Sequence, residues 1–346
     1  MSDITKIDKN FKIETKLNKA DIKFYNVLEE PFKIYGVFYE NGKFRRLPEE
    51  VAKTVNDGVY GLHAHTAGGR VRFKTDSSYV AINAVMPNIG KMSHFALSGS
   101  AGFDLYEKRD GKEVYVKSFI PAFNFNGGFE GVIELGGSKM REFTINFPTY
   151  SEVSELYIGL SNNAAVLPSD PYKCEKPVVF YGSSITQGGC CSRPGNTYEG
   201  FVSRRFDIDH INLGFSGSAR GEDEIAEYIK DLDMSVFVYD YDHNAPTLEH
   251  LVATHERMYN IIRKANPDLP IIIMTKPRFL PDVKAFEAIK KTYENAKANG
   301  DNVYYLDGRQ LMALAENEGT VDGCHPNDLG FFSMAKAVGD ILEGIL

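Results

Sequence analysis

Two short stretches of this sequence have the residue types and spacing of a serine nucleophile with its base. Ser183 and Ser184 directly follow the apolar run VVFYG at 178–182, and Asp322 stands three residues before His325 in DGCHPND. A serine hydroxyl is a weak nucleophile unless a base takes its proton and a third group orients that base. We therefore interpret Ser184, His325 and Asp322 as a candidate catalytic triad, with Asp322 near enough in one loop to reach the imidazole Nδ1.

Acyl transfer by a serine also needs hydrogen-bond donors for the developing oxyanion, and three candidates occur. The first is the backbone N–H of Ser184, provided that its turn opens a helix. The second is Gly217 in NLGFSGSAR, where the missing Cβ lets the backbone approach a substrate. The third is the side-chain amide of Asn244 in YDYDHNAP. Gly214 is a rival to Gly217, which is favoured because it lies further into its loop.

The elements that would position these residues are visible in the second half of the chain. Strand-like runs (VVFYG, HINLGF, SVFVYDYD, PIIIMTKP, VYYLDG) alternate with helical ones (TYEGFVSRRF, GEDEIAEYIKDL, TLEHLVATHERMYNIIRKA, VKAFEAIKKTYENAKA, RQLMALAENE, GFFSMAKAVGDILEGI). This alternation predicts a parallel sheet with helices on both faces, a three-layer α/β/α domain. Ligands bind at the carboxyl ends of the strands in such sheets, which is where the candidate residues stand.

The first half of the chain has a different sequence pattern. Short β-rich runs (FKIYGVFY, GRVRFKT, YVAINAVM, EVYVKSF, GVIEL, REFTINF, ELYIGL) are separated by Gly, Asp, Asn and Ser, and only PEEVAKTV has the pattern of a short helix. This spacing predicts an all-β sandwich. The proline-containing stretch LPSDPYKCEKP reads as a linker. We expect a sandwich domain at 1–168, a linker at 169–177 and a catalytic domain at 178–346.

The composition of the chain limits the classes of molecule that we expect it to bind. The 346 residues carry a net charge of -8, which disfavours nucleic acid or an anionic membrane as the main partner. No apolar run approaches the ~20 residues of a membrane span, and the first 21 residues lack the apolar core of a secretory signal. We expect a cytoplasmic protein that acts on a small-molecule or oligosaccharide ester, and a homo-oligomer remains open.

The four cysteines are too few for a disulfide framework in a chain of this length. A zinc site built from Cys190, Cys191, Cys324 and His325 is not expected, because the C-x-x-C spacing is missing. The glycine-rich nucleotide motifs G-x-G-x-x-G and G-x-x-x-x-G-K-[ST] do not occur where they would be needed. The sequence therefore predicts neither a cofactor nor a catalytic metal.

In chain order, the serine turn, the glycine, the asparagine and D-x-x-H-P resemble the four sequence blocks of the SGNH (GDSL-type) hydrolases. The resemblance covers roughly residues 176–346. It implies that Ser184 is the nucleophile and that Gly217 and Asn244 donate to the oxyanion. It further implies that Asp322 and His325 complete the triad.

Two positions depart from the usual pattern of that family. The familiar G-D-S is replaced by a G-S-S similar to that of a "GSSIT" subgroup, and Asp242 stands where glycine usually precedes Asn244 by two residues. In the first half, GFDLY at 102–106 is similar to the G-x-D-L-Y signature of a jelly-roll-like β-sandwich found ahead of some SGNH hydrolases. The resemblance implies a sandwich domain that precedes the hydrolase domain.

Each of these residues also has a plainer interpretation. A serine after a strand is commonly a turn or helix-cap residue, and Asn244 could cap the helix that follows it. Asp240 and Asp242 could form the carboxylate pair of a glycosidase, although strand-end polar residues are the simpler account. Ser183, Arg220 and His243 are candidate substrate contacts; Arg220 could instead cap a helix and His243 could be a bystander. The joint occurrence in chain order favours catalysis.

These observations predict a metal-independent serine esterase that removes a small acyl group, in particular acetyl, from a carbohydrate. Activity is expected to rise with pH as His325 loses its proton. The sugar rests on family analogy, and the chain has no Trp, although 19 Tyr and 23 Phe could stack on sugars. The alternatives are a lysophospholipase or thioesterase-type acylhydrolase, and a non-catalytic carbohydrate-binding protein.

Overall fold

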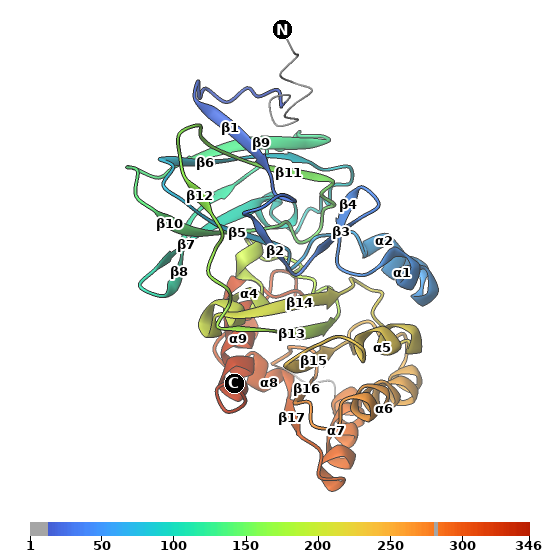
Figure 1. The fold of residues 1–346 in the computed structure, drawn as a ribbon. Helices are drawn as coiled ribbons and strands as arrows, with labels where there is room; N and C mark the ends of the chain where they lie inside the picture. Colours follow the sequence, from blue (N-terminus) through green and yellow to red (C-terminus); the bar gives the residue numbers. More distant parts are fainter. Residues whose placement is uncertain (1–12, 280–282) are drawn as a thin grey trace.

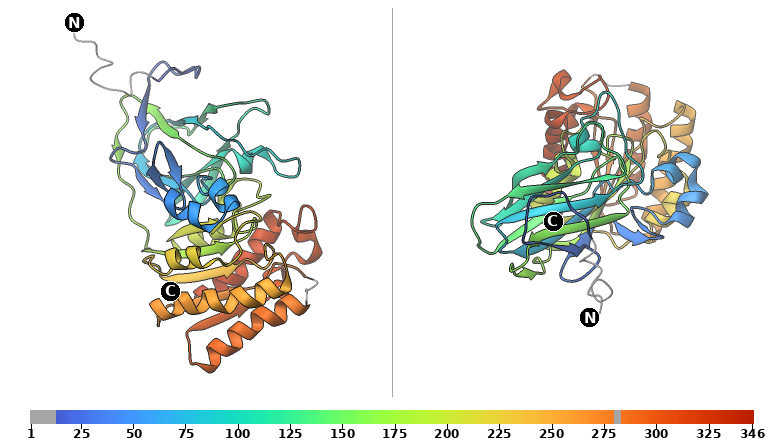
Figure 2. Two further views of the ribbon diagram at one scale, coloured as in Figure 1. Left: turned by 90° about the vertical axis from the view of Figure 1, so that its right-hand side faces the viewer. Right: turned by 90° about the horizontal axis from the view of Figure 1, so that it is seen from above.

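Two differently built parts follow one another along the chain in the computed structural model, which describes residues 13–279 and 283–346. An antiparallel β-sandwich comes first, and a parallel sheet with helices on both faces follows it (Figure 1). The sandwich lies at one end of the molecule and the α/β part at the other (Figure 2, left). Both fold-class predictions are confirmed. The first twelve residues of the segment searched for a secretory signal lie outside the described residues.

The sandwich consists of two sheets that bury alternate side chains between them. One sheet has the order β1 (Ile22–Asn26), β11 (Glu155–Ser161), β6 (Tyr79–Val85), β9 (Gly128–Glu134). The other has the order β12 (Val166–Leu167), β5 (Arg70–Thr75), β10 (Arg141–Asn146), β7 (Phe103–Arg109), β8 (Lys112–Phe119), with β2 (Lys33–Tyr35) also on β5. Val80 and Ile82 of β6 face Phe143 and Ile145 of β10 across the core, as the period of two requires.

Some short elements of this part were not predicted. The expected helix is α1 (Glu49–Val55), but α2 (Asp57–Leu62) and α3 (Leu97–Ser100) also form, as does a hairpin of β3 (Phe38–Glu40) and β4 (Lys43–Arg45). The side chain of Asn56 accepts from the Val59 N–H and caps α2. Elements this short have no full hydrophobic period, so local sequence gives them little signal.

The second part has five parallel strands in the order β14 (Ile208–Gly214), β13 (Cys174–Gly182), β15 (Val236–Asp240), β16 (Ile271–Met274), β17 (Val303–Leu306). In β13, Val178 and Phe180 pack with one group of helices: α4 (Tyr198–Phe206), α8 (Gly308–Leu311) and α9 (Asp328–Leu342). Val179 and Tyr181 pack with the other group: α5 (Asp223–Ile229), α6 (Leu248–Ala265) and α7 (Val283–Ala298). Burial on both faces explains why these strands read as continuous apolar runs.

The first strand begins earlier than the sequence indicated. β13 starts at Cys174, inside the segment expected to be linker, where Cys174 pairs with Ile208 before the register shifts at Val178. The irregular register accommodates Pro177, which has no N–H to donate to a ladder. Pro177 therefore marks an irregular position within β13 and not the end of a linker.

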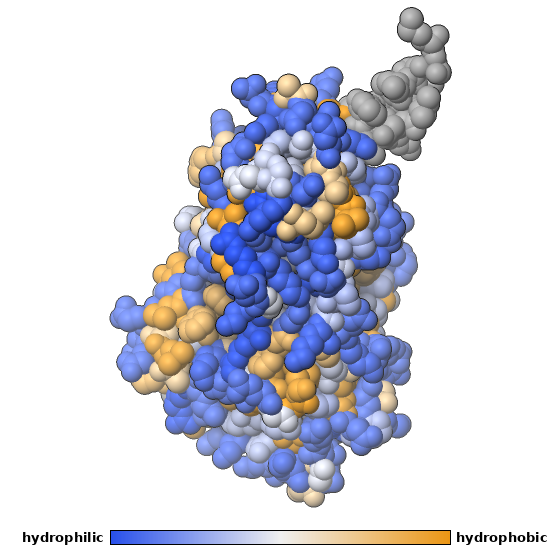
Figure 3. Space-filling model, turned by 60° about the vertical axis from the view of Figure 1, so that its left-hand side comes forward, coloured by the Kyte–Doolittle hydropathy of each residue, from blue (hydrophilic) through white to orange (hydrophobic). Residues whose placement is uncertain are grey.

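Within the described part of the chain, no helix is long and apolar enough to cross a membrane. The face drawn in Figure 3 is mostly hydrophilic, with separate hydrophobic areas.

Two arginines of the N-terminal part bind the free edge of β14. Arg46 Nη1 donates to the carbonyls of Asn212 and Gly214 at 3.1 and 2.7 Å, and Arg70 Nη2 donates to the carbonyl of His210 at 3.1 Å. Alternate residues of an edge strand direct their carbonyls outward, and here these carbonyls are satisfied by buried guanidinium groups. The sandwich thus covers the sheet edge nearest the candidate nucleophile.

Candidate active site

The three strands that precede the candidate residues end at the same level of the sheet. Gly182, the last residue of β13, pairs with Gly214 of β14 on one side and with Asp240 of β15 on the other. The loops that leave these strand ends carry Ser184, Gly217 and Asn244. Parallel pairing therefore starts all three loops side by side, as expected for this topology.

Residues 184–190 form consecutive turns, so no helix begins at the serine and the N–H of Ser184 does not lie at a helix N-terminus. The Ser183 carbonyl accepts from the Gln187 N–H at 3.0 Å, and the Ser184 carbonyl accepts from the Gly189 N–H at 2.8 Å. A side chain at Gly182 would place its Cβ 2.0 Å from Asp240 Oδ1, so this tight approach requires glycine. Within the described residues the Ser184 N–H has no acceptor, which leaves it available to a ligand.

The side chains of Ser184, His325 and Asp322 form one hydrogen-bonded chain. Ser184 Oγ lies 2.9 Å from His325 Nε2, and His325 Nδ1 lies 2.8 Å from Asp322 Oδ2. The other oxygen of Asp322 accepts from the backbone N–H groups of Cys324 and His325 at 2.9 and 2.8 Å. Residues 141 positions apart in sequence are thereby within proton-transfer distance.

The carboxylate of Asp322 is held in its charged form. Burial alone would raise the pKa of Asp322, but hydrogen bonds from the His325 ring and from the His325 and Cys324 backbone outweigh it and lower the pKa to about 2. A charged Asp322 favours the tautomer with the proton on Nδ1. The imidazole then presents the Nε2 lone pair to the serine hydroxyl.

The nearby His243 does not compete as a base. Burial, with the Lys276 and Arg278 cations next in importance, lowers the pKa of His243 to about 3. Its Nδ1 lies 3.8 Å from the sulfur of Cys324, and its ring is only partly exposed. His243 therefore stays neutral at ordinary pH and borders the site.

Gly217 and its rival Gly214 have different environments. The Gly214 N–H donates to Asn212 Oδ1 at 2.9 Å, and Gly214 is buried in the strand. Gly217 is exposed, has a left-handed φ of +66° and, in the part that the structure describes, has no acceptor for its N–H. The free donor is thus at Gly217.

The amide of Asn244 is tied to the loop that carries Gly217. Asn244 Nδ2 donates to the Phe215 carbonyl at 3.0 Å, which uses one of its two N–H groups and leaves the second. Asn244 does not cap α6, because the side chain of Thr247 accepts from the His250 N–H at 3.2 Å. The capping interpretation of Asn244 is therefore wrong.

Of the remaining candidate substrate contacts, Ser183 is ruled out. Its side chain is fully buried, and its hydroxyl accepts from the Ile185 N–H at 3.2 Å. Arg220 is exposed and donates through Nη2 to the Gly217 carbonyl at 3.1 Å, so it supports the glycine loop. It does not cap α5, whose N-cap residue is Glu222.

Asp240 and Asp242 do not form a glycosidase pair. Asp240 is buried under the serine turn and accepts from Thr186 Oγ1 at 2.7 Å. Asp242 Oδ2 accepts from the Lys276 N–H at 3.2 Å and is also buried. Both carboxyl groups hold strand-end loops together, which was the simpler account.

A glutamine that sequence reasoning missed connects the serine turn with the glycine loop and the sandwich. Gln187 is fully buried; its Oε1 accepts from the Ser216 N–H at 2.9 Å. Its Nε2 lies 3.3 Å from the Thr149 carbonyl and 3.1 Å from His65 Nδ1. A glutamine has no catalytic signature in sequence, so only the fold reveals this connection.

The sandwich also reaches the site directly. Tyr150 donates through its hydroxyl to the Ser184 carbonyl at 3.1 Å, and its ring packs edge-on against Phe95 at 5.3 Å between centroids. The ring of His94 lies 5.5 Å from that of His325. The catalytic loops are therefore flanked by side chains from both parts of the chain.

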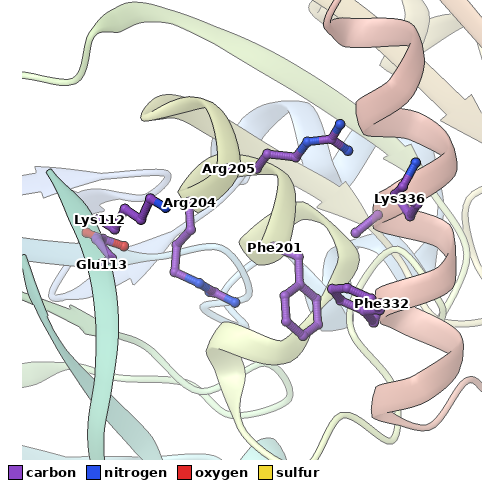
Figure 4. Close-up of a pocket in the computed structure, with 8 residues that line it drawn as sticks. Lys112, Glu113, Phe201, Arg204, Arg205, Phe332 and Lys336 are labelled. Atoms are coloured by element: carbon purple, nitrogen blue, oxygen red, sulfur yellow. The ribbon is translucent and has the colours of Figure 1, made fainter.

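Two cavities of about 520 Å³ lie at different places relative to the triad residues. The cavity in Figure 4 lies between β8 and the helices α4 and α9, and none of the triad residues lines it. The other is lined by residues of the sandwich loops 91–98 and 120–123, including Phe95, which touches Tyr150 beside the serine turn. None of the triad residues lines the second cavity either, but Phe95 connects it to the serine turn through Tyr150.

Comparison with known proteins agrees with this arrangement. Residues 175–343 match the GDSL-like lipase/acylhydrolase family, and residues 22–166 match the GxDLY N-terminus of SGNH-hydrolase-type esterases. Among curated proteins, no sequence match was found.

Solved structures share the whole two-part architecture. A Bacteroides ovatus protein described as a GDSL-like lipase is 30% identical, with a TM-score of 0.84 over 94% of this chain and 98% of that chain. The salicylyl-acyltransferase SsfX3 from a tetracycline biosynthetic pathway is 18% identical, with a TM-score of 0.74 over 95% and 99% of the two chains. The acetyl xylan esterase Est2A of Butyrivibrio proteoclasticus is 13% identical, with a TM-score of 0.58 over 94% and 98%. The chain thus belongs to the GDSL-like lipase/acylhydrolase family and is a hydrolase of ester bonds.

Proposed function

We propose that this protein is a serine esterase that removes a small acyl group, in particular acetyl, from a carbohydrate. The observation that carries the chemistry is the hydrogen-bonded chain from Ser184 through His325 to Asp322, with distances of 2.9 and 2.8 Å. The backbone N–H groups of Ser184 and Gly217 have no acceptor among the described residues. The loop of Gly217 is joined to the serine turn by the hydrogen bond from the Ser216 N–H to Gln187 Oε1.

In the first half of the proposed reaction, Ser184 Oγ attacks the ester carbonyl carbon while His325 Nε2 takes the hydroxyl proton. The oxyanion accepts from the N–H groups of Ser184 and Gly217 and from the second N–H of Asn244. Asp322 stabilises the imidazolium that has formed. The C–O bond of the ester then breaks, His325 gives its proton to the leaving alkoxide, and the sugar hydroxyl departs.

In the second half, water enters and attacks the carbonyl of the acyl-enzyme. His325 takes a proton from the water, and the same donors hold the second oxyanion. The bond from the acyl carbon to Ser184 Oγ breaks and the proton returns to that oxygen. The carboxylic acid leaves, and the enzyme returns to its starting state.

The choice of a carbohydrate ester is supported by the architecture and by the cavity of the sandwich loops. The acetyl xylan esterase has the same two-part fold. The cavity of about 520 Å³ lined by the sandwich loops, with Phe95 and the exposed Phe123 in its wall, offers room for the alcohol part of the substrate. Aromatic rings are suited to stack on sugars. Long-chain acyl groups, as in a lysophospholipase, are the competing class.

Labelling with a fluorophosphonate tests the chemistry. Wild type and Ser183→Ala should both be labelled, since the Ser183 hydroxyl is buried, whereas Ser184→Ala should not be. Labelling of folded Ser184→Ala, or no labelling of wild type, would reject the proposed nucleophile and favour a binding protein.

Substrate profiling then tests the acyl group and the alcohol. Wild type should release acetate from a panel of acetylated oligosaccharides, and kcat/KM on model esters should fall from acetyl to butyryl to octanoyl. A rise toward octanoyl, without acetate release from any acetylated sugar, would favour the lipase-like alternative.

A further inference from the structure

Three side chains with metal-binding atoms, each from a different loop, meet around the catalytic imidazole. His94 comes from the sandwich loop before α3, Cys190 from the turns after β13, and His325 from the loop before α9. One nitrogen or sulfur ligand atom of each lies within 4.8 Å of those of the other two. Sequence spacing gave no sign of this group, because the sandwich contributes one member.

The atoms are free to bind. Asp322 occupies Nδ1 of His325, so Nε2 is the nitrogen that remains, and it is shared only with the Ser184 hydroxyl. Cys190 carries a free thiol, and its left-handed φ of +73° is an uncommon conformation for a residue other than glycine. His94 is exposed, and in the described part of the chain its ring nitrogens have no hydrogen-bond partner.

The geometry is near that of a zinc site. Zinc binds sulfur at about 2.3 Å and imidazole nitrogen at about 2.0–2.1 Å, so tetrahedral ligand atoms stand roughly 3.5 Å apart. The atoms here must approach each other by at most about 1.3 Å, relative to the 4.8 Å limit. Rotation of the exposed His94 ring can shorten its distances to the other two atoms, and a movement of the Cys190 side chain must shorten its distance to His325. Asp322 already holds the far nitrogen of His325, as carboxylates do behind zinc-bound histidines.

We propose that His94, Cys190 and His325 form an inhibitory site for Zn²⁺, with water as the fourth ligand. The ion takes the His325 Nε2 lone pair that must receive the Ser184 proton, so the zinc-bound enzyme cannot start acyl transfer. On binding, the thiol of Cys190 loses its proton to solvent and its sulfur becomes a zinc ligand. The site acts as an inhibitor-binding site and supplies nothing to the reaction.

This ion is a reversible ligand. Cys190 is a free cysteine, so zinc must displace the thiol proton to bind. The requirement weakens the site relative to one built from preformed thiolates. Removal of the ion restores the hydrogen bond between Ser184 and His325.

The test measures binding and inhibition separately. Zinc binding is followed by calorimetry, and Co²⁺ serves as a probe because a thiolate ligand gives it a charge-transfer absorption. Both are measured in wild type and in Ser184→Ala, so the binding result stands even if the esterase assignment fails. We expect one ion per chain, and inhibition of wild type that a chelator reverses.

The variants locate the site. Cys190→Ser should lose the thiolate–cobalt absorption. It and His94→Ala should each raise the zinc concentration for half inhibition by at least ~10-fold, measured relative to the zinc-free activity of the same variant. Cys174→Ser, at the partly exposed start of β13, is the matched control and should behave as wild type. The proposal is overturned if wild type binds no zinc, or if the absorption and the inhibition persist in both site variants.

Discussion

Replacement of Gln187 by methionine tests whether the buried glutamine positions the oxyanion loop. Methionine has a similar length, but it removes the acceptor for the Ser216 N–H at 2.9 Å. It also removes the donor to the Thr149 carbonyl and to His65 Nδ1. Burial lowers the pKa of His65 to about 3, so its ring is neutral and Nδ1 can accept. Three polar groups at the junction of the two parts lose their partner together.

The size of the effect follows from these contacts. An unpaired buried polar group costs about 1–3 kcal/mol, so the loss of partner at three groups should lower the free energy of unfolding by at least ~3 kcal/mol. Ser216 is the neighbour of Gly217, and loss of one oxyanion donor lowers kcat by about 10²–10³-fold. A loop that is loosened rather than removed should lower kcat by about 10- to 100-fold. KM should change little, because the oxyanion exists only beyond the ground state.

The assay is steady-state hydrolysis of an activated acetyl ester, together with thermal unfolding. Thr292→Val is the control, because it removes the buried hydrogen bond to His255 Nδ1 between α6 and α7, on the far side of the sheet. It should lower stability and leave kcat unchanged. If Gln187→Met loses stability but keeps the kcat of the control, the glutamine is only structural and the reasoning is refuted.

Four further predictions follow from contacts of three residues. Since the pKa of Asp322 is lowered to about 2, its carboxylate stays charged above that pH and adds no second proton to the acid side of the activity profile. We therefore expect kcat/KM to rise from acid pH with the slope of one proton, and a slope of two would contradict this. The pKa of Asp322 is lower in the folded state than in the unfolded chain, where it is about 4, so this carboxylate stabilises the fold above pH ~4. That stabilisation is lost as the pH falls toward 2. Thermal unfolding of Asp322→Asn should lack this loss of stability in acid. Arg46→Met removes buried hydrogen bonds to β14 and should cost at least ~3 kcal/mol in chemical unfolding; a change below ~1 kcal/mol would mean that the arginine does not hold the edge. Gly182→Ala places a Cβ 2.0 Å from Asp240 Oδ1, so soluble, wild-type-like activity would contradict the packing beneath the serine turn.

The sequence predicted the α/β part better than the sandwich. Strands of the α/β part are continuous apolar runs separated by long amphipathic helices, and handedness and burial leave few ways to arrange them. In the sandwich, β5 and β6 follow each other in sequence but lie in different sheets. Alternation indicates a strand and its buried face, yet it does not indicate which strand will pair with it.

In the active site, too, some residues were predicted from the sequence and others were not. Ser184, Asp322 and His325 were predicted because few residue types can act as nucleophile, base and orienting acid, and two of them stand three residues apart. Gln187, Arg46 and Tyr150 gave no signal, because any of these residues is usually a surface or core residue. Ser183 was predicted as a contact from its position beside the nucleophile, but the turn directs it inward.

The sequence by itself determined the two-part fold, the family and the ester-hydrolase class, because periodicity and reactive residue types are local properties of a chain. The tertiary structure decided which groups surround the serine. Arg46 meets Gly214 across 168 positions, and His94 meets His325 from the other part of the molecule. Such contacts depend on how two separately formed cores dock, and docking depends on the combined shape and polarity of surfaces that no short stretch of sequence encodes.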